Sequence, residues 1–286
     1  MFTKSTKKIL ALVLAGTMML SMAACGGSKT EESEKSADAQ TMGETMQKIK
    51  DRGTLIMGVN ATYAPFEFHA DVNGEDTIVG FDIELGQAIA DELGVELVIK
   101  DMAFDGLLPA LAAGKVDILP GLAETEERAQ NAAFSIPYHR STQVVVARKT
   151  DSADFTADTD LAGKTIGILK GATQEITFPI HYPNAEMYQL GKIPDLIMAV
   201  KNGKIDGVIL DEVVAIQYSK ANDDLIASDA KYQLTVEEDP GSSVLVRKGD
   251  NEDLIEVINT VLDRVMNDGS LHQWELDAIE LMDAPE

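Results

Sequence analysis

The residues best suited to bind a small charged molecule lie in the segment that ends at Arg128. An apolar run, expected to form a strand, reaches a turn at Gly121, and Thr125 then opens a Thr-Glu-Glu-Arg sequence typical of a helix start. Arg128 would occupy the first helical turn, where the helix dipole disfavours a positive charge. Either Arg128 binds a ligand carboxylate through its planar guanidinium, or it forms a structural ion pair with Glu124 or Glu127.

Residues that commonly perform catalysis or bind metals show no comparable arrangement. The sequence contains no GxSxG, HExxH or P-loop motif. The four histidines lie far apart and lack metal-ligand spacing: His69, His139, His181 and His272. We therefore expect no catalytic residue, no metal site and no cofactor.

The first twenty-five residues have the pattern of a secretory signal. Three lysines precede an apolar run that is too short to span a bilayer comfortably, and Ala23 and Ala24 stand before Cys25, the only cysteine. This end resembles a lipobox, although Met22 stands where that motif prefers Leu. We expect residues 1–24 to be a signal peptide and Cys25 to carry the lipid, including palmitate. The alternative is an ordinary signal peptide cut near Ala24, with Cys25 incidental.

The excess of acidic residues limits the kinds of molecule that the protein is expected to bind. The chain has 48 acidic and 24 basic residues, and three of the lysines lie in residues 1–24. So acidic a protein is not expected to bind nucleic acid or an anionic membrane face. Residues 25–45 are small, polar and charged, which is typical of a disordered tether. The remaining residues, about 240, suffice for one large domain or two lobes.

The folded part is expected to alternate strands and helices. Residues 54–59 form a strand, and residues 66–68 and 77–80 flank an Asn73-Gly74 pair that favours a hairpin. Asp82 stands at an N-cap position, and Gly94 ends the helix that follows. Further elements are expected as strands at 95–99, 116–119, 164–169 and 205–210, and as helices at 104–113 and 194–201. Such alternation predicts an α/β fold with mainly parallel sheets.

The second half of the chain repeats the pattern of the first. Residues 113–117 and 202–206 each end an amphipathic helix with Gly-Lys and begin a buried strand. Helix–Gly–Lys–strand connections are common, because Gly suits the C′ position and Lys suits the C-terminal end of the helix dipole. Matching surroundings nevertheless favour two similar lobes. A cleft between them would be the default binding site.

An ordered set of short motifs extends from about Gly53 to Trp274. Its members are Tyr63-Ala64-Pro65-Phe66-Glu67-Phe68, Gly80-Phe81-Asp82-Ile83-Glu84-Leu85, Leu108-Pro109-Ala110-Leu111, Gly114-Lys115-Val116-Asp117, Thr125-Glu126-Glu127-Arg128, Phe134-Ser135-Ile136-Pro137-Tyr138, Lys170-Gly171-Ala172-Thr173-Gln174-Glu175 and Asp211-Glu212-Val213. In this order they resemble the amino-acid-binding proteins of ABC importers, an extracellular solute-binding family that includes histidine- and glutamine-binding proteins. The resemblance implies a two-lobed periplasmic-binding-protein-like fold, with two mainly parallel sheets, flanking helices and a hinge of two crossovers.

The resemblance also implies how the ligand backbone is held. In the family, the α-carboxylate meets an Arg in the position of Arg128 and backbone N–H groups in the positions of Ala123 and Thr173. The α-ammonium group meets an acid in the position of Asp211 and a backbone carbonyl in the position of Gly121. The family usually has Ser or Thr in place of Ala123, so one hydroxyl that helps hold the ammonium is missing.

The ligand side chain would lie between Tyr63 and Phe104, with Asn60 near its tip. Structural alternatives stay open, since both aromatic residues could belong to the core and Asp211 could be a helix cap. Asn60 replaces an Asp that several relatives have. We therefore expect a neutral polar or apolar amino acid rather than Arg or Lys.

The sequence thus predicts a lipid-anchored, extracytoplasmic substrate-binding protein that closes around an amino acid and delivers it to a membrane ABC permease. Lobe 1 would comprise residues 46–141 and 242–286, and lobe 2 residues 142–241. The crossovers are expected near Arg140–Gln143 and Glu237–Ser242. The alternatives are an enzyme similar to cyclohexadienyl dehydratases, with Glu175 the acid nearest the cleft, and a sensor that acts through a partner. The net charge favours a monomer.

Overall fold

The computed structural model describes residues 42–156, 161–232, 234–235, 237–249 and 251–283. The expected signal peptide, Cys25 and most of the expected tether lie outside these residues. Helix α1 (Glu44–Arg52) begins inside the range expected for the tether, and Thr45 and Met46 are already buried. The packed part of the chain therefore begins slightly earlier than composition suggested.

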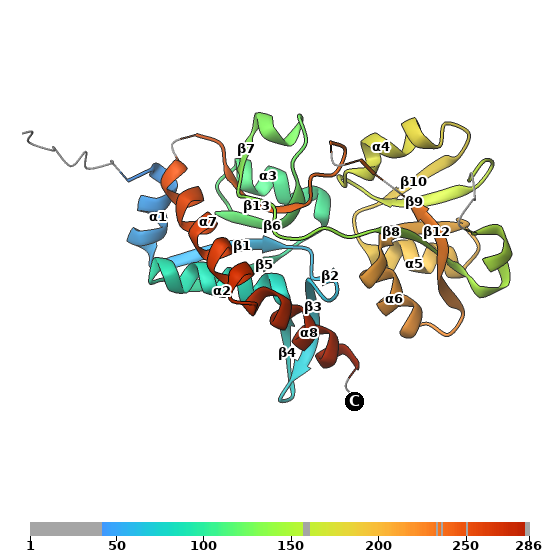
Figure 1. Ribbon diagram of the computed structural model, residues 1–286, viewed down its shortest axis with the longest axis horizontal. Helices are drawn as coiled ribbons and strands as arrows, with labels where there is room; N and C mark the ends of the chain where they lie inside the picture. Colours follow the sequence, from blue (N-terminus) through green and yellow to red (C-terminus); the bar gives the residue numbers. More distant parts are fainter. Residues whose placement is uncertain (1–41, 157–160, 233, 236, 250, 284–286) are drawn as a thin grey trace, which may run out of the picture. The chain divides into compact units, whose positions relative to one another are not determined.

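The first lobe contains a five-stranded sheet. Its strands are β1 (Thr54–Val59), β5 (Glu96–Asp101), β6 (Ile118–Ala123), β7 (Ala132–Phe134) and β13 (Ser242–Arg247). They lie in the order β5-β1-β6-β13-β7. Strands β1, β5 and β6 are parallel, whereas β13 runs antiparallel to both β6 and β7. A strand from the end of the chain thus lies between two strands of its first half (Figure 1).

Helices cover this sheet on both faces. They are α2 (Phe81–Leu93), α3 (Leu107–Ala112), α7 (Glu252–Asn267) and α8 (Ser270–Asp283), together with α1. Leu119 and Leu245 pack with the residues of α3, while their neighbours Ile118 and Val246 pack with those of α2 and α7. Adjacent strand residues point to opposite faces, so both sets can be apolar only where both faces are covered.

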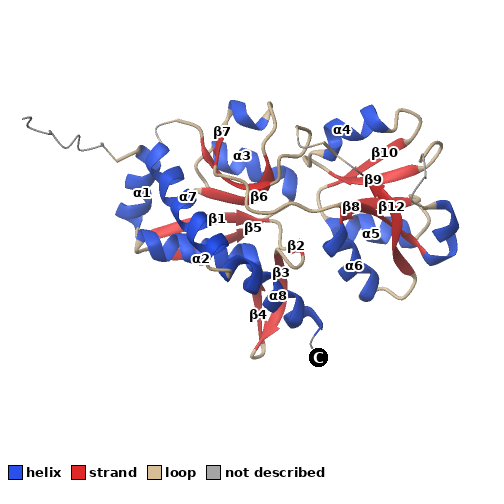
Figure 2. Ribbon diagram, in the orientation of Figure 1, coloured by secondary structure: helices blue, strands red, loops and turns tan. Residues whose placement is uncertain are grey.

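The second lobe repeats this plan. Its strands are β8 (Gln143–Arg148), β9 (Thr165–Leu169), β10 (Glu186–Leu190), β11 (Gly207–Asp211) and β12 (Leu225–Tyr232). Their order is β10-β9-β11-β8-β12, with β9, β10 and β11 parallel and β8 antiparallel to its two neighbours. The helices of this lobe are α4 (Gln174–His181), α5 (Ile193–Lys201) and α6 (Glu212–Lys220) (Figure 2). The expectation of two similar α/β lobes is confirmed.

A small antiparallel sheet extends the first lobe near α2. It consists of β2 (Thr62–Tyr63), β3 (Glu67–Val72) and β4 (Glu75–Val79). Asn73 and Gly74 both have positive φ, of 60° and 87°, as the predicted hairpin turn requires.

Two predictions about helix starts were wrong. Gly80, not Asp82, is the N-cap of α2, and Asp82 lies inside the helix with its side chain fully buried. Arg128 begins a short 3₁₀ turn (Arg128–Gln130) rather than an α-helix. The Arg128 N–H group nevertheless donates a hydrogen bond to Thr125 Oγ1 at 3.2 Å. Tertiary contacts decided both cases, because each side chain has partners distant in sequence.

The chain passes between the sheets twice. It leaves β7 at Phe134 and enters β8 at Gln143, and it leaves β12 at Tyr232 and returns to β13 at Ser242. The expected crossovers fall within these two connections. They meet where His139 and Ser242 form an isolated antiparallel bridge.

Candidate functional site

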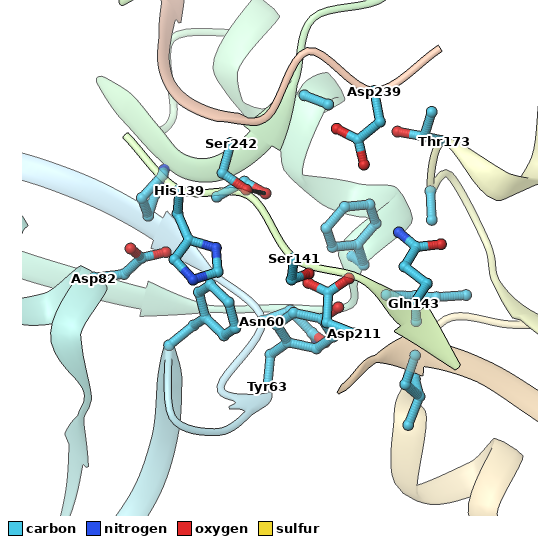
Figure 3. Close-up of a pocket in the computed structure, with 18 of the residues that line it drawn as sticks. Asn60, Tyr63, Asp82, His139, Ser141, Gln143, Thr173, Asp211, Asp239 and Ser242 are labelled. Atoms are coloured by element: carbon cyan, nitrogen blue, oxygen red, sulfur yellow. Dashed lines mark hydrogen bonds between the residues drawn. The ribbon is translucent and has the colours of Figure 1, made fainter. Parts of the chain in front are cut away.

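A cavity lies between residues of the two lobes. All eight residues predicted to contact a ligand line it: Asn60, Tyr63, Phe104, Gly121, Ala123, Arg128, Thr173 and Asp211. They come from loops and strand ends of both sheets, and Figure 3 shows several of them around the same space. The fold therefore brings residues that are far apart in the sequence to one cavity. Their roles toward a ligand stay predictions.

Arg128 is buried and held by two backbone carbonyls, one from each lobe. Its Nη1 donates to Ala123 O at 2.6 Å and its Nη2 donates to Gly171 O at 2.9 Å. Among the ion pairs of the described residues, none joins Arg128 to Glu124 or Glu127, so the structural ion pair considered above is not found. Within the described part of the chain, the guanidinium thus forms no ion pair with a carboxylate.

Burial lowers the pKa of Arg128 to about 10, and the charges of Asp239 and Glu127 partly offset this effect. The side chain still carries its positive charge at neutral pH. A buried cation without a bonded carboxylate favours the binding of an anion.

Asp211 occupies the N-cap position of α6, but its side chain makes no capping hydrogen bond. Burial raises the pKa of Asp211, and hydrogen bonds from Ser141 and Tyr63 counteract part of the rise. Burial and the charge of Asp211 raise the pKa of Tyr63 well above its usual value, so the phenol stays protonated and can donate. Asp211 lines the cavity beside Ser141 and Tyr63 (Figure 3).

Thr173 is the N-cap residue of α4 and is largely buried in the cavity wall. The first N–H groups of a helix lack partners within the helix and lie at the positive end of its dipole. Thr173 and Arg128 thus border the cavity with groups that favour an anion.

Asn60 lines the cavity, but its amide is already engaged. Its Nδ2 donates to Met102 O at 2.8 Å, and its Oδ1 accepts from the Thr62 hydroxyl at 2.8 Å. The side chain is 1 % exposed. Asn60 therefore fixes the loop after β1 rather than presenting both polar atoms to the cavity.

Two acidic residues in the wall were missed as site residues. Burial, and then the charge of Asp82, raise the pKa of Glu67 well above its usual value. Burial also raises the pKa of Asp82 to about 7, even though Tyr138 donates a hydrogen bond to Oδ1 at 2.7 Å. Among the described residues Asp82 Oδ2 has no hydrogen-bond partner. Both residues lie in motifs noted above, but there they served only as family markers or as a helix cap.

Further polar residues reach the cavity from the crossovers. Gln143 opposes Asp211 in the β8–β11 ladder, and its buried Oε1 has no partner among the described residues. Asp239 lies on the return crossover, and its charge acts on both Arg128 and Asp211. No sequence signal indicated these residues, because crossovers carry no regular pattern.

The described residues contain no group of three or more His, Cys, Asp and Glu side chains that could hold a metal ion. Within the same part of the chain, no helix is long and apolar enough to cross a membrane.

Comparison with known proteins identifies the family. The sequence profile of the bacterial extracellular solute-binding proteins, family 3, matches residues 55–276. The arginine-binding extracellular protein ArtP of Bacillus subtilis (strain 168) is 32% identical over 273 residues, which cover 93% of this chain and 96% of ArtP. A probable histidine-binding protein of Campylobacter jejuni is 31% identical over 264 residues, covering 92% and 95% of the two chains.

A solved structure agrees with these relatives. The amino acid ABC transporter substrate-binding protein AbpA from Streptococcus pneumoniae, bound to L-arginine, superposes with a TM-score of 0.77 at 33% identity. The match covers 84% of this chain and 100% of the AbpA chain. The resemblance drawn from the ordered motifs is confirmed. The chain belongs to the bacterial extracellular solute-binding proteins, family 3.

Proposed function

We propose that this protein is the receptor of an amino-acid ABC importer and that its ligand carries a positively charged side chain. The observation that carries the proposal is the distribution of charge in the interlobe cavity. Arg128 and the start of α4 favour an anion, whereas Asp211, Glu67 and Asp82 favour cations. A zwitterionic backbone with an additional cationic group matches this distribution.

The ligand backbone would bridge the two lobes. Its α-carboxylate would contact Arg128 and the N–H groups of Ala123 and Thr173, and its α-ammonium group would contact Asp211 and Gly121 O. Three of these residues belong to the first lobe, whereas Thr173 and Asp211 belong to the second. Binding would therefore favour the state in which the lobes are closed around the ligand.

A cationic side chain departs from the neutral preference expected from the sequence. That expectation rested on Asn60, which replaces an acid. The amide of Asn60 is engaged by Met102 and Thr62, and the acids Glu67 and Asp82 line the same cavity. A bound cation would favour the ionised carboxylates and compensate their burial. The arginine-binding relative and the arginine-bound AbpA structure also support a ligand with a cationic side chain.

We further propose that the protein acts outside the cytoplasmic membrane. Residues 1–24 would be removed and Cys25 lipidated, and residues after Cys25 would tether the lobes near the permease. Family membership supports the extracellular location. The receptor would act as a monomer.

Calorimetry of the purified protein with individual amino acids tests the ligand. L-arginine or L-lysine should bind at least about tenfold more tightly than L-glutamine or L-leucine, because only a cation neutralises the acids in the cavity. A ligand at one hundred times its Kd should also raise the free energy of unfolding by about 2.7 kcal/mol. Tighter binding of a neutral amino acid would contradict the proposed side chain and restore the neutral preference.

Variants of the charged residues test the orientation of the ligand. Arg128→Ala and Asp211→Asn should each weaken binding by tenfold or more, on the order of 2 kcal/mol, because each leaves one charge of the ligand unpaired. The exposed Arg264, which pairs with Glu92, offers a matched control, and Arg264→Ala should leave affinity unchanged. Unchanged affinity in either cavity variant would refute the orientation.

A further inference from the structure

The ammonium group of an amino acid has three N–H donors to satisfy. The predicted site offers it two acceptor groups, the Asp211 carboxylate and Gly121 O, and the methyl group of Ala123 provides none. Inside a closed cavity an unpaired charged donor is costly, so a third acceptor nearby would increase affinity.

Ser242 lies where such an acceptor is needed. It is directly opposite Ala123 in the antiparallel β6–β13 pair, and it lines the cavity. Residues directly opposite in such a pair point to the same face of the sheet, with Cβ atoms about 4.5–5.5 Å apart. Figure 3 shows Ser242 at the same pocket as Asp211. A hydroxyl that residue 123 lacks is thus present on the facing strand.

The Ser242 hydroxyl is next to the other predicted acceptor. Its Oγ donates to Gly121 O over a long distance of 3.5 Å. The backbone of Ser242 is fixed, because its N–H donates to His139 O and its carbonyl accepts from Tyr138 N–H, both at 2.8 Å. The hydroxyl can therefore donate to Gly121 O and still accept one hydrogen bond through its lone pairs.

A bulge brings the Gly121 carbonyl to this position. The register of β6 and β13 shifts between Ser243 and Leu245, and Gly121 has a φ of 76°. A Cβ at Gly121 would lie 3.1 Å from Asp82 Oδ2, so glycine suits both the conformation and the space. The bulge thereby interrupts the ladder beside Ser242.

We propose that Ser242 is a ligand-binding residue whose hydroxyl accepts a hydrogen bond from the α-ammonium group, beside Asp211 and Gly121 O. The inference rests on the proposed function, because it requires a ligand with an α-ammonium group. Ser242 is also the first residue of β13 after the return crossover, so this contact joins the ligand to the hinge.

The test compares L-arginine with 5-guanidinopentanoate, which is arginine without its α-amino group. Ser242→Ala should weaken L-arginine binding about fivefold to tenfold and leave binding of the deaminated analogue unchanged. Ser243→Ala, a buried serine on the same strand that does not line the cavity, is the matched control and should not alter either affinity. If L-arginine does not bind, L-glutamine and glutaramic acid form the corresponding pair.

A second variant separates ligand contact from folding. Ala123→Ser in the Ser242→Ala protein should restore affinity for the amino acid, because it returns a hydroxyl to the facing strand. Equal losses for the amino acid and its deaminated analogue, or wild-type affinity in Ser242→Ala, would overturn the inference while leaving the receptor function intact. A wild-type protein that binds no amino acid would overturn both.

Discussion

At the scale of single residues, the cavity wall contains ionisable groups that form no ion pair within the described part of the chain. Two of them are fully or largely buried: Arg128 donates to two carbonyls, and Asp82 accepts from one phenol. Burying charged groups in this way lowers the stability of the folded protein unless a group of opposite charge binds to them. The arrangement suits a site that gains its counter-charges from a ligand.

Asp82 should make the stability of the ligand-free protein depend on pH. Its folded pKa of about 7 lies above the ordinary value of 3.8, so the folded state keeps a proton that the unfolded state loses. Its contribution to stability is complete below about pH 4 and is lost as the pH rises through 7. The shift corresponds to about 4 kcal/mol at most. Asp82→Asn should therefore be more stable than wild type at pH 8, with a difference that shrinks toward pH 4.

Thermal unfolding from pH 4 to pH 8 measures this difference. Asp76→Asn, at an exposed carboxylate of the β3–β4 hairpin, is the control and should follow the wild-type curve. A constant offset between Asp82→Asn and wild type over the whole range would show that Asp82 does not titrate as proposed.

At the scale of elements, periodicity predicted strands close to β1, β5, β9 and β11, but it predicted none at β7, β8, β10, β12 or β13, and tertiary contacts decided the helix starts. The start of α2 illustrates the difference. The N–H groups of Phe81 and Asp82 donate to Pro65 O and Phe66 O, so a loop of the small sheet caps the helix. The residue spacing favoured Asp82 as the N-cap. Spacing alone does not show that a loop elsewhere in the chain supplies the hydrogen-bond acceptors.

Gly80 should be essential for this junction. Its φ is 131°, and a Cβ there would lie 2.1 Å from Phe66 O, a backbone atom. Gly80→Ala should lower the free energy of unfolding by more than about 3 kcal/mol, since the loop or the helix must move. Gly94→Ala is the matched control, because Gly94 also has positive φ but open space around its Cβ, and it should cost only about 1 kcal/mol. Urea unfolding that gives equal losses would contradict the role of the contact.

At the scale of the whole molecule, direct contacts join the lobes around the cavity. Lys170 pairs with Asp105 at 2.7 Å, and the Tyr218 hydroxyl donates to Thr62 O at 2.8 Å. Phe104 N–H donates to Gly191 O at 3.2 Å. These contacts stabilise the closed arrangement independently of any ligand, so they set part of the apparent affinity.

Asp105→Asn should weaken ligand binding only slightly, by less than about fivefold, because the Asp105–Lys170 pair is exposed and screened. The effect should disappear in 0.5 M NaCl when measured by calorimetry. The exposed Glu44–Lys48 pair of α1 lies in one helix, and Glu44→Gln should have no effect at either salt concentration. A loss above tenfold that persists in high salt would indicate that Asp105 contacts the ligand.

Apolar periodicity, turn residues and ordered motifs are local properties of the chain, so they were sufficient to predict the alternation of strands and helices, the two lobes and the family. The family resemblance nominated eight residues that the fold gathers around one cavity. Three features could be found only in the folded molecule: the burial of Asp82 beside Glu67, the approach of Gln143 and Asp239 to the cavity, and the pairing of Ser242 with Ala123. Burial, pKa and facing partners depend on distances through space, which the packing of the sheets and helices sets for residues far apart in sequence.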